Sequence, residues 1–161
     1  MPTPEFVLDL RRHVGTAPLP LVGVTAVILR GDEVLLGRRS DTGALTPITG
    51  IVDPGEEPAV TARREALEEA GVEISVDVLA WVHQVPRVTY PNGDQADYLD
   101  LTFRCTWLAG EPHSADGEMI DLAWHPLADL DGLADEHRRR VHAATAIGDT
   151  ARFEGGTRTG T

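Results

Sequence analysis

Three glutamates stand close together in the segment from Arg64 to Val72, at positions 65, 68 and 69. If this segment is helical, residues advance by about 100° each, and Glu65, Glu68 and Glu69 span roughly 100° of one face. Carboxylates this close repel one another, and a hard divalent cation such as Mg²⁺ relieves the repulsion while keeping waters and phosphate oxygens among its ligands. The pattern therefore indicates metal-assisted chemistry on a phosphate, and the alternative is a solvated acidic helix face.

The helix that would carry these glutamates has recognisable ends. Pro58 suits its first turn, and Gly71 suits the position just after its last turn. On the side away from the glutamates stand apolar residues that we expect to pack on a sheet: Ala59, Val60, Ala66, Leu67 and Ala70. Arg63 falls in the middle of that side, where packing does not explain it.

A segment without regular periodicity precedes this helix. Residues 40–57 are interrupted by Gly and Pro, so we expect a long loop there. Long ordered loops in compact domains are often functional. The loop is therefore expected to work together with the glutamates.

Loop and helix together resemble the Nudix box of the Nudix hydrolases, G-x5-E-x7-R-E-U-x-E-E-x-G-U, in which U is aliphatic. The matching residues are Gly50, Glu56, Arg64, Glu65, Glu68, Glu69, Gly71 and Val72. Ala66 departs from the pattern, because the family prefers a larger aliphatic residue there. The motif covers about a seventh of the chain, and the order of strands and helices on both sides also fits the Nudix fold.

The resemblance implies hydrolysis of a nucleoside diphosphate linked to another group, with Mg²⁺ or alternatively Mn²⁺ as cofactor. It implies that Glu65 and Glu69 are the main metal ligands and that Glu68 assists directly or through water. Glu68 and Glu69 would accordingly be catalytic residues. The carbonyl of Gly50 would complete the coordination shell.

Further residues receive roles from the same resemblance. Arg64 is expected to pair with Glu56 and hold the loop against the helix. Thr49 stands where many family members have a glycine, so it would place a side chain beside the substrate channel. Arg38 and Arg39 follow an expected strand and could meet a substrate phosphate, the alternative being a solvated strand end.

A carboxylate from outside the helix is also expected. In many family members a loop before a late strand supplies a general base or an extra metal ligand, and residues 113–118 form such a loop here. Glu118 follows Gly117, so the chain can turn sharply and aim a side chain inward. We expect Glu118 to be the base or ligand and Asp116 to face solvent, and the alternative is a solvated loop carboxylate.

Periodicity and turn signals predict the remaining elements. Helices are expected over residues 5–12 and 134–147, and strands over 21–29, 34–37, 73–88, 98–108 and 121–125. This mixture with hairpins predicts an α/β (α+β) fold, a Nudix-type α/β/α sandwich on a mixed β-sheet. We expect one domain over residues 1–149 and a flexible tail rich in Gly and Thr over 150–161.

Composition limits the partners. The 161 residues carry a net charge of -12, and all 14 basic residues are arginines. An acidic surface repels a phosphate backbone, which argues against general nucleic-acid binding, and the lack of lysine excludes a P-loop lysine or a Schiff base. The apolar run from Leu19 to Leu29 is about half as long as a membrane helix, and the N-terminus lacks a signal pattern. The expectation is a cytoplasmic protein without a membrane partner.

A small-molecule nucleotide is the expected substrate, and a homodimer is left open. Pro86 and Tyr90 lie near positions that the family associates with ADP-ribose and with diadenosine polyphosphates, so the two hints nearly cancel. ADP-ribose or another nucleotide sugar is slightly favoured. The alternatives are a house-cleaning nucleoside triphosphate pyrophosphohydrolase and, in a different class, a non-catalytic nucleotide-sensing Nudix module.

Other polar side chains are expected to be structural or solvated. His83 lies in a strand and should be packed or face the substrate rather than bind a metal. His137 should lie at the surface. The aspartates at positions 94, 97 and 100 surround a hairpin, where turn chemistry and solvation account for them.

Overall fold

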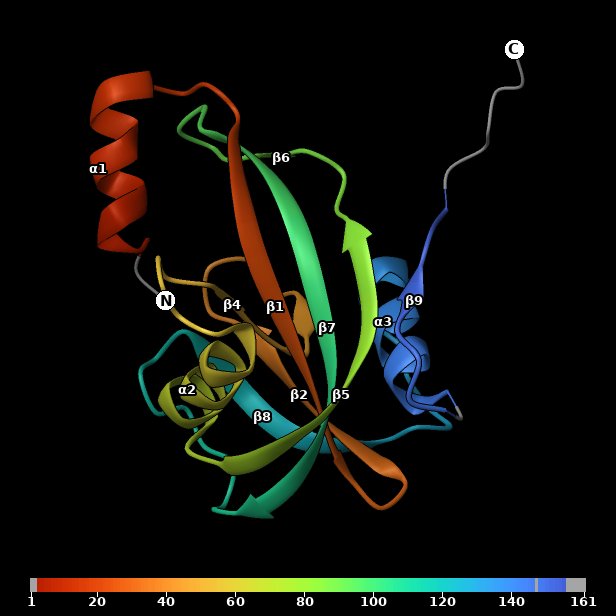
Figure 1. Cartoon of the computed structure of the whole chain (residues 1–161). Coiled ribbons are helices and arrows are strands. Elements are labelled where there is room, and N and C mark those ends of the chain that lie inside the picture. The colour runs from red at the N-terminus through yellow and green to blue at the C-terminus, as the bar shows by residue number, and fades with distance from the viewer. Residues whose placement is uncertain (1–2, 147, 156–161) are drawn as a thin grey trace.

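One mixed sheet organises the chain in the computed structural model, which describes residues 3–146 and 148–155 (Figure 1). Its strand order is β3-β2-β1-β7-β5-β9, while β4 pairs with β1, β6 with β7 and β8 with β2. The strands of the described residues are β1 (Leu19–Arg30), β2 (Glu33–Arg39), β3 (Leu45–Thr46), β4 (Ile48–Ile51), β5 (Glu73–Gln84), β6 (Val88–Thr89), β7 (Gln95–Ala109), β8 (Met119–Pro126) and β9 (Arg152–Phe153).

The centre of the sheet is formed by β1, β7 and β5. β1 runs parallel to β7, and β5 runs antiparallel to β7. On its other side β1 pairs antiparallel with β4, with Val24 opposite Gly50 and Thr25 opposite Thr49. This pairing places Gly50, the first residue of the expected motif, next to the middle of a central strand.

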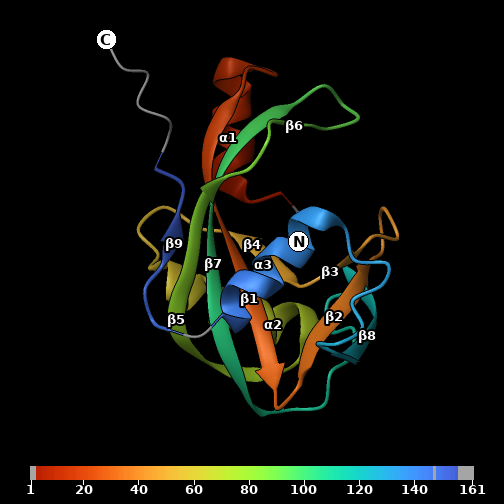
Figure 2. The same ribbon diagram turned by 90° about the vertical axis from the view of Figure 1, so that its right-hand side faces the viewer.

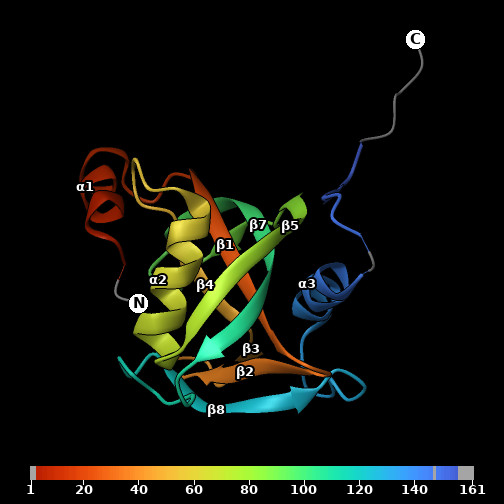
Figure 3. The same ribbon diagram turned by 60° about the horizontal axis from the view of Figure 1, so that its bottom comes forward.

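Two helices, α2 (Pro58–Ala70) and α3 (Asp135–Thr145), cover opposite faces of the sheet (Figure 3). Alternate residues of a strand point to opposite faces, so Val24 packs with Ala66 in the core under α2, and Val27 packs with Val141 in the core under α3. The predicted α/β/α sandwich on a mixed sheet is confirmed.

A third helix, α1 (Glu5–Val14), lies at the end of the molecule formed by the first half of β1 and by β6 (Figure 2). Its Val7 packs with Leu19, Leu21 and Ala96 in a separate apolar cluster. None of the helices in the described ranges is long and apolar enough to cross a membrane.

Several expected boundaries are corrected. The predicted loop over residues 40–57 contains β3 and β4, because the threonines and isoleucines between the Gly and Pro positions suit a pleated strand. The predicted strand over 73–88 ends at Gln84, two residues before Pro86, which has no N–H to donate to a ladder.

The C-terminal segment also contains an element that the sequence does not predict. Arg152 and Phe153 form β9, which pairs parallel with Trp81 and Val82 of β5. Residues 156–161 of the expected tail lie outside the described residues. The domain boundary at residue 149 stays a prediction.

Candidate active site

The carboxylate helix α2 buries two of its three clustered glutamates. Glu65 and Glu69 are 1% and 2% exposed, and they share the buried side of the helix with Ala62, Ala66 and Ala70. The expectation that Val60 and Leu67 pack on the sheet is wrong, since they are 42% and 55% exposed. Small alanines let the helix approach the sheet closely, so the carboxylates beside them point into the protein.

The opposite side of α2 therefore faces solvent, and this explains Arg63. That residue is exposed, together with its neighbours on the same side. The helix begins with Pro58 and ends at Gly71, whose left-handed backbone (φ 65°) returns N–H groups to the last turn. Both ends lie where the sequence predicts them.

Gly50 on β4 makes room for the buried carboxylate. A Cβ at this position would overlap the side chain of Glu65. Any larger residue here would require the Glu65 side chain to shift, and the main chain of Gly50 lies directly against the Glu65 carboxylate. Helix and strand together bring a backbone segment to the glutamates.

Burial controls the charge of the two glutamates. It raises the pKa of Glu65 to about 7, against the opposing effect of Arg64. It raises the pKa of Glu69 to about 8, and the negative charge of Glu65 adds to this. The Oε2 atoms of Glu65 and Glu69 are buried and accept no hydrogen bond within the described residues.

Two buried, unpartnered carboxylate oxygens are costly in a folded protein, and a divalent cation is a partner that would satisfy both. No group of three or more His, Cys, Asp or Glu side chains among the described residues forms a complete metal site. The two glutamates offer oxygen donors of the kind that a hard divalent cation binds, and a cation such as Mg²⁺ also keeps waters and phosphate oxygens among its ligands. A backbone carbonyl at Gly50 is a suitable further ligand.

Arg64 connects the loop to the helix. Its Nε and Nη2 donate to Oε1 and Oε2 of Glu56 at 3.0 and 2.9 Å, and this pairing holds the pKa of Glu56 near 2. Its Nη1 donates to Glu65 Oε1 at 2.9 Å and to Glu68 Oε2 at 3.1 Å. One guanidinium thus partly offsets three carboxylates, of which the Glu68 side chain, at 52%, is the most exposed.

The arginines at the end of β2 have different surroundings. Arg39 donates to both carboxylate oxygens of Asp41, at 2.9 and 2.7 Å. This hydrogen bonding is the main cause of the raised pKa of Arg39, and the negative charge of Glu69 contributes. Arg38 donates instead to the carbonyl of Gly43 at 3.0 Å. The charge of Arg39 therefore interacts with that of the buried Glu69.

The remaining candidates lie on β4 and on the loop of residues 110–118. Thr49 is partly buried on β4, on the face opposite that of Gly50. Glu118 is partly buried and Asp116 exposed, and Asp116 Oδ1 accepts a hydrogen bond from the Glu118 N–H at 2.9 Å. The charge of Asp116 also contributes to the raised pKa of Glu69, so this loop lies near the glutamates.

Comparison with known families agrees with this geometry. The family model of the NUDIX domain matches residues 19–144. The chain belongs to the NUDIX domain family. The match contains β1 to β8, α2 and nearly all of α3, and therefore every residue of the candidate site.

Relatives of this Nudix domain include two kinds of curated protein. A MutT-like protein of Streptomyces ambofaciens is 37% identical over 108 residues, which cover 66% of this chain and 64% of that protein. The NAD-capped RNA hydrolase NudC of Haemophilus influenzae (strain PittGG) is 25% identical over 146 residues, or 84% of this chain. The chain spans 52% of the length of NudC, so it corresponds to about half of that protein.

Solved structures share the fold. An ADP-ribose pyrophosphatase (SSU98_1448) from Streptococcus suis 89-1591 superposes with a TM-score of 0.61 at 20% sequence identity, covering 84% of this chain and all of that one. At this level of identity the similarity supports the fold of the Nudix domain.

Outside the Nudix box, the domain contains a buried polar network that the sequence analysis missed. Asp100 is 3% exposed rather than solvated as expected, because it lies within β7 and not in the hairpin. Thr25 Oγ1 donates to Asp100 Oδ1 at 2.9 Å, and Arg140 Nη1 lies 3.3 Å from the same oxygen. Glu136 Oε1 lies 3.3 Å from Arg140 Nη2 and 2.5 Å from His83 Nε2, so it connects the two residues. His83 is packed, as expected.

The alternation of side chains along a strand, with a period of two residues, could have predicted part of this network. Asp100 and Thr102 share one face of β7, and Thr102 Oγ1 donates to Asp100 Oδ2 at 2.7 Å. His137 also departs from its expected surface position. It is partly buried, and burial, followed by the charge of Arg140, lowers its pKa to about 4.

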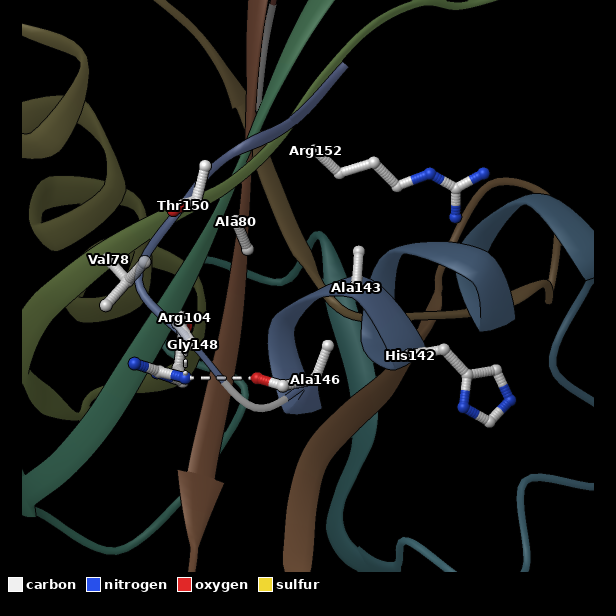
Figure 4. Close-up of a pocket in the computed structure, with 9 residues that line it drawn as sticks. All are labelled: Val78, Ala80, Arg104, His142, Ala143, Ala146, Gly148, Thr150 and Arg152. Carbon is white, nitrogen blue, oxygen red and sulfur yellow. Dashed lines mark hydrogen bonds between the residues drawn. The ribbon is translucent and has the colours of Figure 1, made fainter. Parts of the chain in front are cut away.

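A pocket of about 180 Å³ lies elsewhere in the Nudix domain, between β5, α3 and the C-terminal segment (Figure 4). Its basic residues do not converge on a common point. Arg104 donates to the carbonyl of Ala146 at 3.4 Å, whereas His142 and Arg152 point away from it (Figure 4). Among the described residues no carboxylate lines this pocket, so they offer none of the chemistry of the Nudix box there.

Proposed function

We propose that this Nudix domain is a pyrophosphohydrolase that cleaves a diphosphate linkage in a nucleoside diphosphate linked to another group, with Mg²⁺ as cofactor. The observation that carries the proposal is the buried pair Glu65 and Glu69, each with an unpartnered oxygen, next to the main chain of Gly50. Mn²⁺ would serve the same oxygen ligands.

In this proposal Glu65, Glu69 and the Gly50 carbonyl hold the cation, and Glu68 reaches it directly or through water. A bound divalent cation offsets phosphate charge and makes a water more acidic. Arg64 keeps Glu56 and the loop in place, which fixes the strand end that carries Gly50.

The other residues act on the substrate and the water. Glu118 takes the proton of the attacking water, whose oxygen bonds to one phosphorus while the bond from that phosphorus to the bridging oxygen breaks. If Glu118 is instead a further metal ligand, it still contributes negative charge at the same place. Arg39 exchanges Asp41 for a substrate phosphate, since both present oxygens to a planar guanidinium. Arg38 and Thr49 are the remaining residues that we assign to contacts with the substrate.

The names of similar proteins support the substrate class. They include an NAD-capped RNA hydrolase, an ADP-ribose pyrophosphatase and a UDP-X diphosphatase. ADP-ribose or another nucleotide sugar is therefore our first choice. We further propose a small-molecule nucleotide as the partner, a cytoplasmic location and no general nucleic-acid binding, and we leave a homodimer open.

A substrate panel tests the proposal. The protein is incubated with ADP-ribose, UDP-glucose, diadenosine polyphosphates and nucleoside triphosphates, with Mg²⁺ or with EDTA, and the products are separated. The expected result is that a nucleotide sugar gives one nucleoside monophosphate and one sugar phosphate, and that both form only with Mg²⁺. Pyrophosphate released from a triphosphate would support the house-cleaning alternative. Binding without any product would support the non-catalytic module.

Two variants of the loop test the role of Glu118. Glu118→Gln should lower kcat by about 10²-fold or more with little change in KM, the scale of lost general-base catalysis. Asp116→Asn, which removes a neighbouring charge, serves as the control and should change kcat little. If the two variants behave the other way round, Glu118 loses its role.

A further inference from the structure

The C-terminal end of α2 is covered by the loop of residues 110–118, which connects β7 to β8. The last carbonyls of a helix have no partner within the helix and need one from elsewhere. Here the loop supplies it: the N–H of His113 donates to Ala70 O at 3.1 Å, and the N–H of Ala115 donates to Glu69 O at 3.2 Å. The loop is thus bonded to the backbone of the residue that carries a buried carboxylate.

Two glycines make this docking close. A Cβ on Gly110 would overlap the carbonyl oxygen of Gly71, the residue at which α2 ends. A Cβ on Gly71 would in turn overlap the imidazole of His113. The indole N–H of Trp107 donates to the Gly110 carbonyl at 2.9 Å and fixes the start of the loop. At Gly110 backbone therefore lies on backbone, and at Gly71 the imidazole of His113 lies against the backbone.

The far end of the loop is also fixed. The carbonyl of Glu118 accepts a hydrogen bond from the N–H of Ser40 at 2.8 Å, just after β2 ends. Glu118 lies three residues after Ala115, and three residues span at most about 11 Å. The backbone of Glu118 is thus confined to the neighbourhood of the helix end that carries Glu69.

We propose that docking of residues 110–115 on the C-terminal end of α2 sets the position of Glu118 relative to Glu65 and Glu69. Gly110 and His113 are positioning residues in this account: they touch no substrate and act through Glu118. The inference rests on the proposed function, because it takes the glutamates of α2 as the reaction centre.

Gly110→Ala is the direct test, because its Cβ would push the loop away from Gly71. Gly132→Ala is the matched control: its φ of 82° is similar to the 91° of Gly110, yet an added Cβ would meet no atom within 4 Å. It therefore introduces the same backbone strain without the collision. His113→Ala is a milder second variant that keeps the test usable if Gly110→Ala does not fold.

The variants are compared by kcat and KM in the wild-type background and together with Glu118→Gln. Gly110→Ala should lower kcat by at least about tenfold with KM within about threefold, and His113→Ala should act in the same direction. Combined with Glu118→Gln, either variant should cause less than about a twofold further loss, because both changes act through one side chain. Gly132→Ala should match the wild type.

A Mn²⁺ titration without substrate gives a second readout. Gly110→Ala and Glu118→Gln should each weaken Mn²⁺ binding by at least about threefold. The double variant should bind Mn²⁺ about as tightly as the single variant with the lower affinity. The inference would be overturned if the losses of Mn²⁺ affinity in the two single variants multiplied in the double variant. Equal losses of affinity in Gly110→Ala and Gly132→Ala would overturn it as well.

The proposed function and this inference can fail separately. If Glu118→Gln keeps its kcat while the wild type hydrolyses its substrate, the positioning inference is wrong and the proposed function stands. If the wild type hydrolyses nothing on the panel, the proposed function is wrong. In that case an unchanged Mn²⁺ affinity of Gly110→Ala overturns the inference, and a weakened one supports it.

Discussion

The side chain of Glu65 fills the space that a Cβ on Gly50 would occupy. The two residues come from different elements, since Gly50 lies in the short strand β4 and Glu65 lies in the middle of α2. Their contact determines how closely the helix approaches the sheet. The glycine of the Nudix box is therefore required by packing as well as by the proposed use of its carbonyl.

Gly50→Ala should consequently displace Glu65 and lower kcat/KM by at least about 10²-fold, because a shift of about 1 Å in a catalytic group costs that much. Gly23→Ala on the neighbouring strand β1 is the control, since an added Cβ there would make only ordinary contacts of 3.5 Å and longer. Steady-state kinetics on both variants check the prediction. A Gly50→Ala enzyme with wild-type kcat/KM would show that Glu65 does not need this position.

Stability without metal should depend on pH through the buried glutamates. Their pKa values of about 7 and about 8 lie above the unfolded value of 4.5. The unfolded chain is ionised at neutral pH while the folded protein still binds protons, so the free energy of unfolding falls as pH rises toward about 8. We expect a lower melting temperature in EDTA at pH 8.5 than at pH 6.5.

Two groups with lowered pKa values contribute mainly below this window. The lowered pKa values of Glu56, about 2, and His137, about 4, affect stability below their unfolded values of 4.5 and 6.5. Glu69→Gln removes one of the two buried acids, so its melting temperature should vary less over the same range. It should also be at least as stable as the wild type at pH 8.5 in EDTA. A clearly less stable variant would indicate a structural ion-pair role for Glu69.

The buried network under α3 should be sensitive to the loss of one partner. Arg140→Met leaves the Asp100 carboxylate buried without its cation, and such changes typically cost about 3–5 kcal/mol. The double variant Arg140→Met with Asp100→Asn should recover part of that loss. Urea unfolding measures all three proteins, and a cost below about 1 kcal/mol for Arg140→Met would mean that solvent reaches Asp100.

Truncation after Asp149 should leave catalysis intact. It removes β9, whose Arg152 lies 4.7 Å from the ring centre of Trp81, and it keeps Asp149, which pairs with Arg104 at 2.7 Å. We expect a lower melting temperature and a kcat/KM within about twofold of the wild type, because β9 pairs with Trp81 and Val82 of β5 and not with α2 or its loop. A large fall in kcat/KM would mean that the tail completes the site or a dimer.

The sequence predicted the parts of the fold that depend on local signals. Pro58 and Gly71 mark the ends of α2 correctly, because helix caps are determined by neighbouring residues. The packing face of α2 was not predicted, since Val60 and Leu67 are more apolar than the alanines that face the sheet. The closeness of helix and strand at Gly50 decides which side is buried, and that is a tertiary property.

The same distinction applies to the candidate site. The spacing of the Nudix box brings Glu56, Arg64 and Glu65 into one hydrogen-bonded cluster, as the resemblance implies. Asp100 was misassigned because a hairpin motif stands a few residues before it, while its partners Thr25 and Arg140 are far away in the sequence. Pairings over such separations follow only from the sheet order and the placement of α3.

Turnover of Glu69→Gln at saturating Mg²⁺ tests the central claim most directly. The substitution keeps the size of the side chain and removes the charge that the account assigns to metal binding and catalysis. It should lower kcat by at least about 10³-fold, the scale of lost metal and electrostatic stabilisation. A Glu69→Gln enzyme that keeps most of its turnover would contradict the claim that the buried carboxylates of α2 are the reaction centre.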